Sequence, residues 1–81
     1  MVKVLFFAQV RELTGTASFS VTESYATVEA LRAALAAKND RWALALAPER
    51  LLTAVNQTLV SADHPLSSGD EVAFFPPVTG G

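Results

Sequence analysis

The last eight residues of the chain are the segment whose residue types best suit chemistry. They are, in order, Phe74, Phe75, Pro76, Pro77, Val78, Thr79, Gly80 and Gly81. Prolines have no N–H donor and fix φ, so a strand must end at the two prolines, and we expect a stiff, extended tail of at most about 20 Å. The two glycines have no side chain, which leaves the α-carboxylate of Gly81 as the most accessible reactive group. A Gly-Gly end alone is typical of a frayed terminus, but a frayed end does not need a stiff spacer, and we predict that chemistry occurs on Gly81.

Catalytic and metal-binding side chains are scarce in the rest of the chain. The sequence has no cysteine and one histidine, His64, which is followed by Pro65 and which we interpret as a solvated turn residue. Side-chain catalysis needs a nucleophile, a base and an orienting group within reach of one another. No metal-ligand spacing and no phosphate-binding glycine pattern is present. We expect no metal site, no cofactor bound by this chain and no catalytic activity of the chain by itself.

Length and charge restrict the class of protein further. A chain of 81 residues has room for one domain with one small core. Six Lys and Arg against eight Asp and Glu give a net charge of -2, and without a basic excess we expect no nucleic-acid partner. The sequence has neither a secretory signal nor the roughly 18 consecutive apolar residues of a membrane span. We therefore expect a cytoplasmic protein without a membrane partner.

Hydrophobic periodicity predicts the elements that would position the tail. Alternation and β-branched residues predict strands over residues 2–9, 17–21, 51–55, 58–60 and 71–75. Helical spacing after an N-cap at Thr27 predicts the main helix over residues 28–37, and Asp40 is expected to cap a shorter helix that Pro48 ends. We expect residues 11–16 to form a polar loop between the first two strands. These two strands would pair as a hairpin.

These elements predict an α+β domain over residues 1–75 and an extended tail over residues 76–81. A mixed sheet of about five strands would carry the main helix on one face. The first and last strands would be parallel, as their connection through a helix allows. This arrangement matches a β-grasp.

Apolar side chains on both faces of the first and last strands predict an exposed patch. Neighbouring residues of a strand point to opposite faces. If Phe6 and Phe74 line the core, then Leu5, Phe7 and Phe75 face outward. An apolar patch of this kind is typical of a surface that binds a partner.

The alternative is that loops or the short helix around Trp42 cover these outward side chains. We interpret Trp42 itself as a core residue. Leu59 is a weaker candidate for the same partner interface. Arg11 is most simply a solvated loop residue, with a role in the interface as the less favoured interpretation.

Long segments of the chain resemble the small subunit of molybdopterin synthase. The matching segments are residues 4–15, 27–32, 40–46, 54–60 and 74–81. The terminal Gly-Gly alone is shared with ubiquitin and with the sulfur carrier of the thiamine pathway. The length of the matching segments is what makes the resemblance specific.

The resemblance implies a ubiquitin-like β-grasp fold and the role of a sulfur carrier in molybdenum cofactor biosynthesis. A ubiquitin-activating-like adenylyltransferase would use ATP with Mg²⁺ to adenylate Gly81, and the acyl adenylate would become a thiocarboxylate. Residues 76–80 would then enter the active site of the large subunit, where the sulfur is transferred to cyclic pyranopterin monophosphate to form the dithiolene. The complex would be a heterotetramer of two small and two large subunits. A sulfur carrier of another pathway, such as thiamine synthesis, and a ubiquitin-like interaction module that is never activated are the alternatives.

Overall fold

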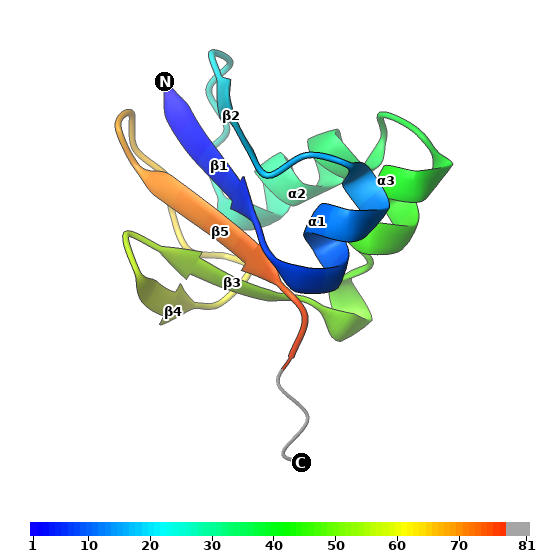
Figure 1. Ribbon diagram of the computed structural model, residues 1–81. Helices are drawn as coiled ribbons and strands as arrows, with labels where there is room; N and C mark the ends of the chain where they lie inside the picture. Colours follow the sequence, from blue (N-terminus) through cyan, green and yellow to red (C-terminus); the bar gives the residue numbers. More distant parts are fainter. Residues whose placement is uncertain (78–81) are drawn as a thin grey trace.

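The first and last strands of the chain lie side by side at the centre of a five-stranded sheet. The computed structural model describes residues 1–77, the side chain of Arg50 excepted (Figure 1). The strands are β1 (Val2–Phe6), β2 (Ser18–Val21), β3 (Leu52–Val55), β4 (Thr58–Val60) and β5 (Glu71–Phe75). Their order is β2-β1-β5-β3-β4, and β5 is parallel to β1 and antiparallel to β3. The structure confirms the predicted α+β class and the mixed sheet. It also confirms that the first and last strands of the chain pair in parallel.

The main helix, α2 (Val28–Ala36), packs on one face of this sheet, which we call the inner face. Thr27 caps the helix, because its side-chain oxygen accepts a hydrogen bond from the Ala30 N–H at 3.2 Å. The fully buried side chains of the core are Phe6, Phe74, Leu31, Leu46, Val4, Val28 and Val72. Phe6 and Phe74 are therefore core residues, as the alternation predicts, and Val4 and Val72 share their face.

A second helix, α3 (Asp40–Ala45), follows α2, and its cap differs from the prediction by one residue. Asn39 rather than Asp40 accepts the hydrogen bond from the Trp42 N–H, at 3.0 Å. Pro48 begins a 3-10 helix, η1 (Pro48–Arg50), after α3 has ended. Trp42 packs edge-on against Phe6 with ring centroids 5.2 Å apart, so it contributes to the core as expected.

The segment predicted as a polar loop is instead a helix, α1 (Ala8–Thr14). Ala8 has a φ of 51°, a left-handed conformation that turns the chain out of the sheet directly after Phe7. Val10 is buried, and Gly15, with a φ of 68°, closes the helix by donating its N–H to the Arg11 carbonyl. Strand β1 therefore ends at Phe6 rather than at residue 9. Strands β1 and β2 are antiparallel as predicted, but a helix rather than a tight turn connects them.

Three helices and η1 thus accompany the sheet in the described residues, where the sequence predicts only the main helix and one shorter helix. Helices α1 and α3 lie beside each other near the end of β5 (Figure 1). None of the helices within residues 1–77 has the length and apolar character needed to span a bilayer.

Candidate functional site

The root of the C-terminal tail leaves the sheet at the end of its central strand. The last paired residue of β5 is Phe75, which lies opposite Leu52 of β3. Pro76 and Pro77 follow outside the strand, because neither can donate a hydrogen bond to a ladder. Pro76 is half-buried and Pro77 is exposed. The predicted reacting residue Gly81, and with it Val78, Thr79 and Gly80, lies outside the described residues.

An apolar hollow lies on the other face of the sheet, the outer face, beside the tail root. We call it the outer-face hollow, and its lining residues are Leu5, Phe7, Ala54, Gln57, Glu71, Ala73 and Phe75. Its volume is about 410 Å³. The structure therefore brings together the three side chains that the sequence placed outward. Phe7 is 48% exposed, so the alternative in which loops or α3 cover the outward side chains is wrong for this ring, whereas Leu5 and Phe75 are half-buried.

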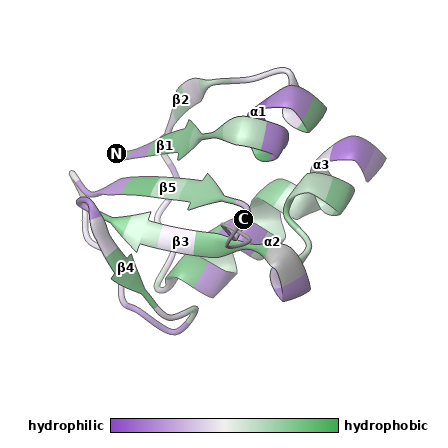
Figure 2. Ribbon diagram, turned by 60° about the horizontal axis from the view of Figure 1, so that its bottom comes forward, coloured by the Kyte–Doolittle hydropathy of each residue, from purple (hydrophilic) through white to green (hydrophobic). Residues whose placement is uncertain are grey.

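Two alanines form the floor of this hollow because of the strand register. Leu5 lies opposite Ala73, Ala73 opposite Ala54, and Ala54 opposite Leu59, so the four share one face in a row across the sheet. Small side chains in the middle of the row leave space between the larger side chains at its ends. Figure 2 shows mostly hydrophobic colour along β1, β5 and β3, the strands that carry Leu5, Ala73 and Ala54. Ala54 and Ala73 are not among the predicted interface residues, although the period-two alternation with Phe75 carries the signal for Ala73.

Leu59 and Arg11, the remaining predicted interface residues, lie outside the hollow itself. Leu59 is 64% exposed on strand β4 and extends the apolar row to the sheet edge. Arg11 is exposed on α1, not in a loop, and its N–H donates to the Phe7 carbonyl at 3.3 Å. Leu52, which is 37% exposed opposite Phe75, is a further outer-face residue that the prediction missed.

Two groups of charged side chains, one around Asp70 and one around Glu29, serve structural roles away from the tail root. Asp70, at the start of β5, accepts hydrogen bonds from the Ser67 N–H at 2.8 Å and from the Asn56 side-chain amide at 3.1 Å. These bonds, the first above all, hold the pKa of the Asp70 carboxyl below its usual range. Arg32 donates to both carboxylate oxygens of Glu29 and lowers the pKa of Glu29. Neither pair lines the outer-face hollow.

His64 and the acidic side chains do not assemble into a catalytic or metal-binding group in the described residues. The backbone carbonyl of His64 accepts a hydrogen bond from the Val28 N–H at 3.0 Å, in the turn region where the sequence placed it. Within residues 1–77, no three His, Asp or Glu side chains lie close enough together to hold a metal ion. No polar or charged side chain is buried in this part of the chain.

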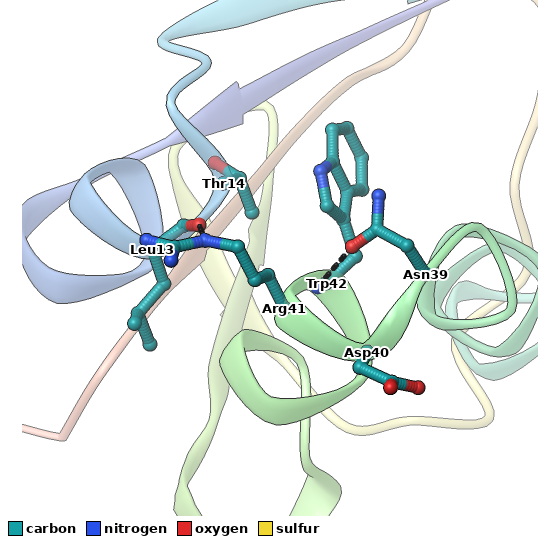
Figure 3. A pocket seen from close by; sticks show the side chains of 6 residues that line it. All are labelled: Leu13, Thr14, Asn39, Asp40, Arg41 and Trp42. Carbon is teal, nitrogen blue, oxygen red and sulfur yellow. Dashed lines mark hydrogen bonds between the residues drawn. The ribbon is translucent and has the colours of Figure 1, made fainter.

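A polar depression between α1 and α3 has a structural explanation (Figure 3). Arg41 donates its Nε–H to the Leu13 carbonyl at 2.9 Å and ties α3 to the last turn of α1. Asn39 uses its side-chain oxygen to cap α3. Two of the polar side chains in this depression thus hold the two helices in place.

Comparisons with known proteins identify relatives over the full chain. The sequence model of the ThiS family matches residues 4–81. The chain is 70% identical over 81 residues to the molybdopterin synthase sulfur carrier subunit of Escherichia coli, covering 100% of both chains. Its structure resembles a chain in the protein-protein complex of subunits 1 and 2 of molybdopterin-converting factor from Helicobacter pylori, at 28% identity and a TM-score of 0.68, over 99% of this chain and 97% of that one. It also resembles the small archaeal modifier protein 1 from Methanosarcina acetivorans, at 24% identity and a TM-score of 0.80, over 99% and 95% of the two chains.

Proposed function

The chain belongs to the ThiS family, and from this premise we propose that it is the sulfur carrier subunit of a molybdopterin synthase and works in molybdenum cofactor biosynthesis. The resemblance to this small-subunit family is confirmed by the full-length match to the Escherichia coli subunit. The ubiquitin-like β-grasp fold is confirmed by the structural likeness to small archaeal modifier protein 1.

The reacting group in this proposal is the α-carboxylate of Gly81. A carboxylate is a poor acceptor for a sulfur nucleophile because its leaving group would be an oxide. Attack of a carboxylate oxygen on the α-phosphate of ATP releases pyrophosphate and forms a mixed anhydride with AMP. A sulfur nucleophile then displaces AMP, and one carboxylate oxygen is replaced by sulfur. ATP, Mg²⁺ and the catalytic side chains belong to a ubiquitin-activating-like adenylyltransferase, and the chain itself is the protein substrate.

The observation that carries the proposal is the position of the tail root beside the outer-face hollow. Pro76 and Pro77 hold the chain extended where β5 ends. Phe75, the residue before them, lines an apolar hollow large enough to receive side chains of a partner. A partner that binds this surface therefore sits next to the point from which residues 76–81 depart. A tail with no side chains on its last two residues suits a narrow active-site tunnel.

Delivery in this proposal takes place in the large subunit of the synthase. Residues 76–80 occupy the active site of that subunit, and the sulfur on Gly81 is transferred to cyclic pyranopterin monophosphate to form the dithiolene. Leu5, Phe7 and Phe75 contact the large subunit, together with Leu59 and Arg11. Two carriers flank a dimer of large subunits, as a heterotetramer requires. The Helicobacter pylori relative is itself part of a complex of subunits 1 and 2, which supports a partner of this kind.

A binding experiment tests this function against that of a thiamine-pathway carrier. The chain is mixed in solution with the purified large synthase subunit and, separately, with the thiazole synthase that receives sulfur in the thiamine pathway. We expect the chain to form a stable complex with the large subunit and none with the thiazole synthase. Mass photometry and calorimetry measure both outcomes. Binding to the thiamine enzyme without binding to the large subunit would contradict the proposal.

A further inference from the structure

A second apolar depression lies on the helical side of the tail root. It is an open groove of about 610 Å³, which we call the α1–α3 groove. Its apolar lining consists of Val10, Leu13, Leu44, Ala45, Ala47, Pro76 and Pro77. Gln9 and Glu49 also line it. The two prolines that begin the tail therefore form part of its wall.

Leu44 is the feature of this groove that the fold does not explain. Five large apolar residues are exposed within residues 1–77, and three of them, Phe7, Leu52 and Leu59, belong to the outer-face hollow or to the sheet face around it. The remaining two are Met1, at the start of the sequence, and Leu44. Leu44 is 67% exposed on α3, where the neighbouring Ala45 and Leu46 already supply the buried contacts to the core. An exposed leucine beside the tail root suits a contact with another protein.

We propose that the large subunit, which receives the tail in the proposed function, grips the tail root from both sides and inserts an apolar side chain into the α1–α3 groove against Leu44. This inference rests on the proposed function. Phe75 lines the outer-face hollow, and the next two residues line the groove. A protein that binds the outer-face hollow at Phe75 and encloses Pro76 and Pro77 on the way to its active site therefore also covers the groove.

The lining of the groove determines the chemistry of the inserted segment. Its walls are aliphatic side chains and proline rings, which favour a Leu, Ile, Met or aromatic side chain of the partner. Glu49 is exposed and presents a carboxylate, which favours an N–H donor or a cation next to the inserted side chain. The contact would fix the direction in which the tail leaves the domain.

Two substitutions remove or block the contact without touching the core. Leu44→Ser removes the apolar anchor, and Ala47→Phe fills the groove with a ring. Ala43→Ser is the matched control, because Ala43 is exposed on the same helix and does not line the groove. We expect the first two variants to bind the large subunit about tenfold more weakly than the unchanged chain in calorimetry, a typical effect of truncating an interface anchor. The control should bind like the unchanged chain, and thermal melting should show all three variants folded.

The outcomes separate this inference from the proposed function. If Leu44→Ser and Ala47→Phe bind within twofold of the unchanged chain while Phe75→Ala binds more weakly, the groove contact is absent and the inference is overturned, although the proposed function stands. If Leu44→Ser slows only the formation of the thiocarboxylate by the activating enzyme, the groove serves that enzyme and the inference is also overturned. If the unchanged chain does not bind the large subunit at all, the proposed function fails and the inference falls with it.

Discussion

The two faces of the sheet can be compared directly through two pairs of adjacent phenylalanines, Phe6–Phe7 and Phe74–Phe75. In each pair, one ring lies on the inner face and the other on the outer face. Phe6 and Phe74 are 1% and 0% exposed, and their ring centroids lie 6.1 Å apart in the core. Phe7 is 48% exposed, and both Phe7 and Phe75 line the outer-face hollow. One step along the chain moves a ring from one face to the other. The same residue type thus stabilises the domain on the inner face and is available to a partner on the outer face.

Phe74→Ala tests the inner face and has the largest expected effect. The ring is fully buried, so its removal leaves a cavity and should lower the free energy of unfolding by about 3 to 5 kcal/mol. Denaturant unfolding monitored by circular dichroism measures this loss. Phe75→Ala is the matched control, one residue away on the other face. A loss below about 1 kcal/mol for Phe74→Ala would contradict the assignment of the core.

Phe75→Ala and Phe7→Ala test the outer face by a different measurement. Each should weaken binding to the large subunit by about 1 to 3 kcal/mol, because an aromatic ring would be lost from the interface. For each variant, the loss in the free energy of unfolding should be smaller than the loss in the free energy of binding. Calorimetry with the large subunit and denaturant unfolding of the free variant measure the two quantities. Equal losses in both would show that these rings belong to the core rather than to an interface.

Asp70 should give the smallest effect, and only on stability. Its folded-state pKa is lowered, so its contribution is present above the unfolded value of about 3.9 and is lost as the pH falls through the folded value. Asp70→Asn should flatten the fall in stability below pH 4, measured as melting temperature against pH. Binding of the large subunit at neutral pH should not change, because Asp70 precedes β5 at the end away from the tail. A loss of binding in this variant would show that the interface extends to that end of the sheet.

Strand alternation explains why the outer face could be predicted from the sequence. Residues 71–75 alternate within a segment bounded by a turn and by prolines, and β5 has these bounds in the structure. The division of Phe74 from Phe75 follows from that alternation alone. The main helix was also predictable, since Thr27 is a strong cap, and it ends one residue before the predicted position.

Helix α1 could not be predicted by the same reasoning. The apolar run that starts at Val4 continues past Phe7 without a glycine or proline to mark the end of the strand. The break occurs at Ala8, which adopts a positive φ that alanine rarely takes. Val10 and Leu13, three residues apart, carried a weak helical signal. The hollow's floor also depends on register between strands, which places Ala54 beside Ala73 and which no single strand reveals.

The mass of the intact chain after activation tests the central claim most directly. The chain is incubated with its activating enzyme, ATP, Mg²⁺ and a sulfur donor, and a variant that lacks Gly81 is treated in parallel. If the carboxylate of Gly81 becomes a thiocarboxylate, the mass rises by the difference between oxygen and sulfur, about 16 Da, through a covalent acyl intermediate. The variant should melt at the same temperature as the full chain, because Phe74 is the last buried core residue in the described part of the chain, and it should show no mass gain. An unchanged mass of the full chain with an activating enzyme that is active on a related carrier would contradict the account.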